Sequence, residues 1–260
     1  MTERDYVSEF YKGIKSNDKD KLKKPCEKES ISAAINFAYG DTKRTLKGIS
    51  NYAKQRENAI NKLTEAFKEY FNGKAPESAD EFNKIHNELC MIWVNELSEN
   101  PDLSKYGKAQ KIVNMTFKYL YCCKSLDGYE EHFDYCHMPL DSFTLEWFKR
   151  NIVKEQRGIK IGTWSSMNNS DIPKQEKDNE GYQTYNYYVD KIKEYCDKNE
   201  KKPLLLEFEV WPQIQRHLAA EAFMFSLKES VTNDEKKKFR KKELDDKLKE
   251  IEDNLNNWRK

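Results

Sequence analysis

Apolar side chains recur every three or four residues over most of this chain, and this spacing restricts its fold more than any other feature. In the clearest example, Ile60, Leu63, Phe67 and Phe71 share one face of a helix, and Gly73 follows where a helix would end. Helices with one apolar stripe bury that stripe against each other. The sequence therefore predicts a mainly α fold, a multi-helix globular bundle.

The same spacing, together with capping residues, predicts the other helices. Ser78 with Glu81 and Thr232 with Glu235 have the sequence of a capping box, which marks a helix start. The predicted helical ranges, in chain order, are 6–14, 30–37, 60–71, 78–97, 107–121, 141–152, 182–196, 213–225 and 232–258.

Two segments favour β structure instead, so the bundle is expected to contain at most a small strand pair. Residues 159–164 are suited to a short strand. Residues 204–211 alternate between two faces and suit a half-buried strand, on which Glu207 and Glu209 would share one face and could point into a cleft. Pro203 at a first helical position would equally suit a helix, and both interpretations of 204–211 stay open.

The chain is expected to divide into three parts. Residues 1–157 would form a helical core domain, and 158–231 a second helical part that begins in a segment rich in Gly, Ser, Asn and Pro. Residues 232–260 would form a long charged C-terminal helix. Its apolar residues repeat in a 4-3-4-3 pattern, which is typical of a coiled-coil-like seam. This seam would pack on the same body, on a second copy or on a protein partner.

Composition excludes some classes of protein. Aromatic residues make up 13% of the chain, and 46 basic residues nearly balance 45 acidic ones, which argues against disorder. The net charge of +1 indicates no partner by itself. No apolar stretch is long enough to span a bilayer, and the residues after Met1 lack an apolar signal core. We therefore expect a cytoplasmic protein, without membrane association, whose six cysteines are free thiols.

The common nucleotide, zinc-protease and hydrolase motifs are absent, and nine glycines leave little material for a phosphate-binding loop, so no cofactor is expected. One cluster of metal-binding residue types lies in the middle of the chain. Its spacing matches no zinc motif, and buried cysteines are common in helix packing, so we assign no metal. The cluster keeps open an enzyme of unrecognised class; its members are Cys122, Cys123, His132, Cys136 and His137. His86 and His217 are interpreted as packing residues on helices.

Residues 102–148 contain a glycine–lysine step at Gly107 and Lys108, then an apolar helix, a loop, and a Leu140–Asp141 step that opens the next helix. This order resembles the core of the helix-hairpin-helix DNA glycosylases. The resemblance implies a hairpin at Gly107 and Lys108, a nucleophilic amine on Lys108 or Lys111, and a catalytic carboxylate on Asp141. A desolvated lysine could attack the sugar while the carboxylate stabilises the developing cation.

A simpler interpretation of the same residues stays open. Asp141 would be a helix N-cap, and Lys108 and Lys111 would be solvated positions in a first turn.

A basic run near the C-terminus could neutralise phosphates of DNA or RNA. Alternatively, its charges would form ion pairs with the acidic residues that follow, on a solvated helix face. The run consists of Lys236, Lys237, Lys238, Arg240, Lys241 and Lys242. Together with the resemblance it predicts a nucleic-acid-associated helical protein that handles DNA bases. The alternatives are an interaction or regulatory module that uses 232–260, and the enzyme of unrecognised class.

Overall fold

The computed structural model describes residues 3–153, 161–168, 184–232 and 249. The chain forms two compact units, Met1–Glu209 and Val210–Lys260. Most of the described residues are helical and no strand occurs among them, so the predicted mainly α, multi-helix bundle is confirmed. None of the described helices combines the length and the apolar character that crossing a membrane requires.

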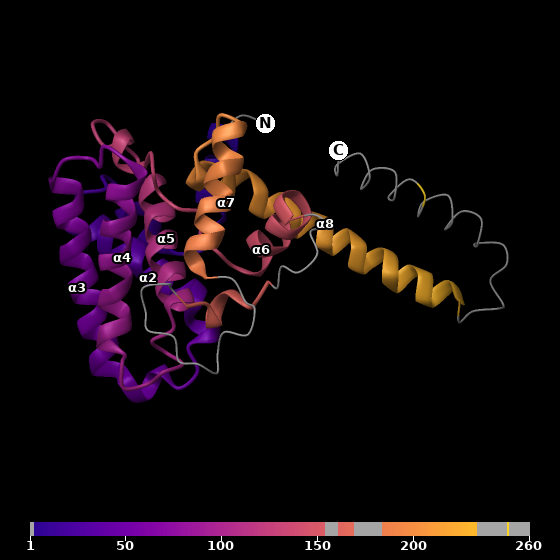
Figure 1. Cartoon of the computed structure of the whole chain (residues 1–260), viewed down its shortest axis with the longest axis horizontal. Coiled ribbons are helices and arrows are strands. Elements are labelled where there is room, and N and C mark those ends of the chain that lie inside the picture. The colour runs from indigo at the N-terminus through magenta and orange to yellow at the C-terminus, as the bar shows by residue number, and fades with distance from the viewer. Residues whose placement is uncertain (1–2, 154–160, 169–183, 233–248, 250–260) are drawn as a thin grey trace. The chain divides into compact units, whose positions relative to one another are not determined.

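Seven helices and the start of an eighth build the described part of the first unit (Figure 1). Short 3₁₀ turns and one π-helical turn, Lys149–Val153, connect them. The helices are α1 (Glu3–Gly13), α2 (Lys28–Thr42), α3 (Ala53–Asn72), α4 (Ala79–Glu96), α5 (Tyr106–Tyr121), α6 (Ser142–Phe148), α7 (Tyr185–Lys198) and α8 (Pro203–Thr232).

The helix α5 lies at the centre of this unit. It packs against α2 and α4, and α3 packs against both of these (Figure 1). Every residue of α5 from Tyr106 to Leu120 is buried. A helix that is buried all round is normally apolar, so the polar residues of α5 must find partners inside the protein.

The predicted apolar stripe of α3 forms part of the core. Leu63, Phe67 and Phe71 are buried, and the Phe67 ring lies 4.9 Å from the ring of Phe117 on α5. Half of the capping box predicted at the start of α4 is present, because the Ser78 side chain accepts a hydrogen bond from the backbone N–H of Glu81 at 3.2 Å. The Glu81 carboxylate accepts instead from the backbone N–H of Glu77 at 2.8 Å.

The predicted strand pair is not formed by the described residues. Residues 204–211 belong to α8, and within 159–164 the described residues 161–163 have no regular structure. The strand interpretation failed because the start of α8 is buried on several sides. Leu204, Leu206 and Phe208 are therefore apolar on more than one helix face, which imitates a strand alternation. Pro203 occupies the first helical position, as the other interpretation expected.

The second unit is described from Val210 to Thr232 and at residue 249. It continues α8, and Pro212 lies inside this helix. The predicted 4-3-4-3 seam and the basic run from Lys236 to Lys242 lie outside the described residues, except for residue 249.

Candidate functional site

A polar stripe runs along α5 on the side that faces the 137–141 loop, α7 and the first turns of α8. Gln110, Lys111, Asn114 and Lys118 form this stripe, because residues at these spacings lie within about a third of a turn on a helix. All four are buried. The stripe carries two features: buried ion pairs, and an uncharged hydrogen-bond network beside a pocket.

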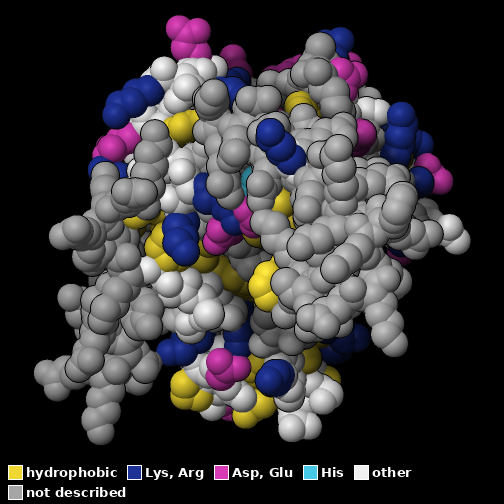
Figure 2. Space-filling view, turned by 90° about the vertical axis from the view of Figure 1, so that its right-hand side faces the viewer, with side chains coloured by type: hydrophobic (Ala, Val, Ile, Leu, Met, Phe, Trp, Pro, Cys, Tyr) yellow, Lys and Arg dark blue, Asp and Glu magenta, His cyan; other side chains and the backbone are white. Residues whose placement is uncertain are grey.

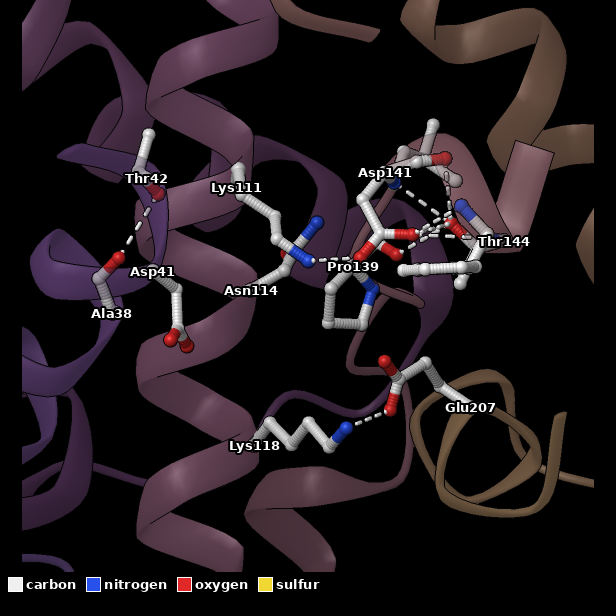
Figure 3. Close-up of polar contacts among 12 residues, drawn as sticks. Ala38, Asp41, Thr42, Lys111, Asn114, Lys118, Pro139, Asp141, Thr144 and Glu207 are labelled. Carbon is white, nitrogen blue, oxygen red and sulfur yellow. Dashed lines mark hydrogen bonds and ion pairs between the residues drawn. The ribbon is translucent and has the colours of Figure 1, made fainter. Parts of the chain in front are cut away.

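The first feature joins two residues that the sequence resemblance had paired. The Nζ atom of Lys111 lies 2.8 Å from Oδ2 of Asp141, and the two side chains are only 7% and 13% exposed (Figure 3). The other carboxylate oxygen of Asp141, Oδ1, accepts hydrogen bonds from the backbone N–H groups of Phe143 and Thr144. Thr144 completes a capping box at the start of α6. Asp141 is therefore an N-cap, and both of its oxygens have partners.

Lys108 has a different partner. Its Nζ atom lies 2.6 Å from Oδ2 of Asp102, whose side chain is 67% exposed. Gly107 and Lys108 lie in the first turn of α5, after the connection from α4. The expectation that Lys108 and Lys111 are solvated is wrong, because this end of α5 is covered. Gly107 donates a backbone hydrogen bond to the carbonyl of Met167 at 2.9 Å, a contact between distant segments that local spacing does not reveal.

A second ion pair lies along the same stripe. Lys118 pairs with Oε2 of Glu207 at the start of α8, and both side chains are almost fully buried (Figure 3). Oε1 of Glu207 accepts no hydrogen bond. Burial raises the pKa of Glu207, although Lys118 and Lys111 oppose the increase. The desolvation of this carboxylate therefore outweighs the attraction of the lysines.

Asp41 on α2 completes this charged region. Its Oδ2 accepts a hydrogen bond of 2.7 Å from the hydroxyl of Tyr119. Burial also raises the pKa of Asp41, and the Tyr119 hydroxyl, Lys111 and Lys118 lower it by smaller amounts. Figure 3 shows Asp41 on α2 beside α5, and the Lys111 side chain extending from α5 toward Asp141. Carboxylates with raised pKa values hold protons more readily than free ones, so this region disfavours additional negative charge.

The second feature is a chain of uncharged polar side chains, which we call the amide–imidazole network. It begins at Gln110 and Asn114 on α5 and reaches the surface of α4 through side chains of α4, α7 and the 137–141 loop. Each link is a hydrogen bond of 3.0 Å or less between side chains. Its members are Gln110, Asn114, His86, Tyr185, His137 and Asn83.

Both histidines of this network are neutral near pH 7. Burial lowers the pKa of His86 to about 4, and burial together with the neighbouring His86 lowers the pKa of His137 well below its ordinary value. The two imidazole rings lie 4.5 Å apart. The ring of Tyr185 stacks on His86 at 5.4 Å with an interplanar angle of 8°. The rings thus hold each other in fixed orientations.

A pocket of about 250 Å³ opens beside this network. Its wall is polar but mostly uncharged, and it is built from α4, the start of α5, the 137–141 loop and α7. Lys84 and Asp190, which are both exposed, are its charged members. The other lining residues include Asn83, Asn87, Tyr106, His137, Tyr185 and Asn186.

Sequence reasoning missed this pocket. It interpreted His86 as a packing residue, and burial of the ring agrees with that interpretation, but His86 also binds Asn114 at 2.8 Å. A signal was present in the sequence. His86 takes an inward position one turn after Phe82, and Asn114 interrupts the apolar residues of α5. A buried polar residue on each of two adjacent helices indicates a mutual hydrogen bond.

The cysteine–histidine cluster does not converge on one point. No group of three or more His, Cys, Asp or Glu residues is placed to hold a metal within the described ranges. Cys122 donates to the backbone carbonyl of Lys118, Cys136 donates to that of His132, and His137 belongs to the network. Burial raises the pKa of both thiols, which keeps them protonated and unreactive.

On the face shown in Figure 2, the described Lys and Arg side chains are interspersed with Asp and Glu. No family model matches the chain, and no curated protein or solved structure matches it.

Proposed function

We propose that the protein binds a small, uncharged heteroaromatic ring of the nucleobase type in the pocket beside His137 and Tyr185. One observation supports this proposal above the others. The buried lining residues of the pocket carry no charge, because both histidines are neutral and the two charged residues of the lining, Lys84 and Asp190, are exposed.

An uncharged polar wall selects an uncharged polar ligand. Burying a charge without a partner costs far more than burying a dipole that finds a hydrogen bond. Amide side chains present a donor and an acceptor next to each other, which is also how the edge of a nucleobase is arranged. Tyr106 and Tyr185 also line the pocket, beside these amides.

The volume of the pocket and the charges at its entrance suit a single nucleobase as the ligand. The pocket volume of about 250 Å³ lies just below the range of about 300 to 1,000 Å³ that is usual for drug-sized ligands. Lys84 and Asp190 at the pocket carry opposite charges, so they add no net charge to it. The base could belong to a free nucleoside or to a nucleotide extruded from a single strand.

Titration of the full chain with uridine, inosine and a short single-stranded oligonucleotide tests this function. We expect saturable NMR shifts of the His86 and His137 imidazole signals, because both rings belong to the network that forms the pocket wall. An Asn87→Leu variant should bind more weakly, while Lys68→Ala on the exposed side of α3 should bind like the wild type. Absence of saturable shifts with all three probes would refute the proposal.

The charged part of the stripe supports a second candidate, base excision. The specific observation is the 2.8 Å contact between Lys111 Nζ and Asp141 Oδ2, which joins an amine to a carboxylate as the glycosylase resemblance implies. Lys108 would not take part, because it binds Asp102 instead. The basic run from Lys236 to Lys242 would then contact phosphates.

Substrate could reach this pair only if it separates, since both side chains are buried. The test is a glycosylase and abasic-site lyase assay with borohydride trapping. We expect a covalent adduct with the wild type and none with Lys111→Met. Lack of any adduct or strand cleavage by the wild type would eliminate this candidate.

A further inference from the structure

We infer that Asn83 presents its amide N–H group to the pocket, so that the pocket selects nucleobases with a carbonyl edge over those with an amino edge. This inference rests on the nucleobase function proposed above and deepens it. The direction of each hydrogen bond in the amide–imidazole network follows from backbone groups whose donor and acceptor roles are fixed.

Gln110 is the network residue whose donor and acceptor roles are determined directly by backbone partners. Its Oε1 accepts a hydrogen bond of 3.2 Å from the backbone N–H of Leu140, and its Nε2 donates to the carbonyls of Leu140 and Gly107, each at 2.9 Å. Backbone groups cannot exchange donor and acceptor roles. The orientation of the Gln110 amide is therefore determined, with its oxygen toward Leu140 N–H.

This orientation determines the next residue, Asn114. The atom of Asn114 that faces Gln110 Oε1 must be a donor, so it is Nδ2, at 3.0 Å. The second hydrogen of Nδ2 goes to the Tyr185 hydroxyl oxygen at 2.9 Å. Asn114 Oδ1 then faces His86 Nε2 at 2.8 Å, so the neutral His86 carries its proton on Nε2.

The hydrogen-bond directions at Tyr185 and His137 follow from those at Asn114 and His86. The Tyr185 oxygen already accepts from Asn114, and the protonated Nε2 of His86 at 3.4 Å cannot accept from it. The Tyr185 proton must therefore go to Nδ1 of His137, at 2.9 Å. A neutral imidazole that accepts at Nδ1 carries its only proton on Nε2.

The last link reaches the pocket. His137 Nε2–H donates to Asn83 Oδ1 at 2.8 Å. The oxygen of Asn83 is thus occupied, and its Nδ2 has no partner among the described residues. Asn83 is half-buried and lines the pocket, so a ligand there meets an N–H donor. A carbonyl oxygen satisfies this donor, whereas an exocyclic amino group places two donors against each other.

The first test needs no ligand. Long-range ¹⁵N–¹H NMR of the free protein should show His137 with a protonated Nε2 and a bare Nδ1. The opposite tautomer would reverse the direction of the chain and overturn the inference. His86, which should also be protonated at Nε2, provides an internal check within the same spectrum.

The second test compares matched nucleosides at pH 8, where both histidines are neutral. In each pair, uridine with cytidine and inosine with adenosine, the first member has a carbonyl group beside a ring N–H, and the second has an amino group beside an unprotonated ring nitrogen. We expect the carbonyl member of each pair to bind about tenfold more tightly to the wild type, which is the usual size of one lost hydrogen bond.

Variants of Asn83 should change this preference in a defined way. Asn83→Asp keeps an oxygen for His137 and replaces the donor with an acceptor, so the amino member of each pair should now bind more tightly. Asn83→Ala should bind both members equally, and Lys68→Ala should keep the wild-type preference.

The outcomes separate the two proposals. If none of the four nucleosides binds the wild type, the nucleobase function fails, and carbonyl selection fails with it. If nucleosides bind but the wild type shows no preference, or Asn83→Asp leaves the preference unchanged, only the carbonyl selection is overturned.

Discussion

Replacing Asp141 with asparagine is a sharp test of the buried charges, because asparagine has one oxygen where aspartate uses two. Oδ1 of Asp141 caps α6 by accepting from two backbone N–H groups, and Oδ2 binds Lys111 at 2.8 Å. The single oxygen of asparagine can replace only one of these. If it keeps the cap, its NH₂ group faces the ammonium of Lys111, and two donors oppose each other.

The expected loss follows from burial. Removing one partner of a buried ion pair costs roughly 3 to 5 kcal/mol, and the lower end applies because Asp141 is 13% exposed. We therefore expect Asp141→Asn to lower the free energy of unfolding by about 3 kcal/mol. Asp141→Ala should lose about 1 kcal/mol more, because the cap is removed as well. The double variant with Lys111→Met should recover about 2 kcal/mol, since no unpaired ammonium is left.

Urea unfolding at pH 7 measures these differences. An unchanged slope of the unfolding free energy against urea concentration shows that unfolding exposes the same amount of surface in each variant. Lys108→Met is the matched control for Lys111→Met on the same helix. Its partner Asp102 is 67% exposed and can be solvated, so the control should lose less than about 1 kcal/mol. An Asp141→Asn variant within about 0.5 kcal/mol of the wild type would refute the argument from burial.

Two further predictions concern packing and pH. Gly107→Ala would place a Cβ atom 1.8 Å from the carbonyl oxygen of Trp164, so we expect a loss of at least about 3 kcal/mol or failure to fold. Gly40→Ala in α2, with nothing within 4 Å, should instead stabilise by about 0.5 to 1 kcal/mol, and urea midpoints compare the two. Because the pKa values of His86 and His137 are lowered in the folded protein, the unfolded chain binds protons at these histidines at a higher pH than the folded protein does. The free energy of unfolding should therefore be highest above about pH 6.5 and fall as the pH decreases toward about 4. Each histidine should contribute a decrease of up to about 1.4 kcal/mol per pH unit. A urea midpoint that is equal at pH 7.5 and 5 would contradict this.

The sequence predicted the helices whose burial is one-sided. In α3 a single stripe is apolar, and its spacing identifies both the helix and its inward face. The Asp141 cap was also predictable, since an N-cap depends on neighbouring residues alone. Both features are local, and local patterns contain enough information to find them.

The site was less predictable because its contacts are not local. His137 and Asn83 bind each other across 54 residues, and Lys111 and Asp141 across 30. The sequence pattern correctly predicted a helix at α5, but it placed Lys108 and Lys111 at solvated positions, and both lysines are buried. That inference assumes that one side of a helix faces water, and α5 has no such side.

Gln110 on α5 connects the charged and uncharged parts of the stripe. Gln110 binds both backbone groups of Leu140, and this places the next residue, Asp141, against Lys111. The same amide orients Asn114 toward Tyr185 and the pocket. One buried side chain therefore fixes the geometry of both features. Because buried polar networks are costly unless each member has a partner, this arrangement tolerates few alternatives. The pocket wall is thus preorganised before any ligand arrives.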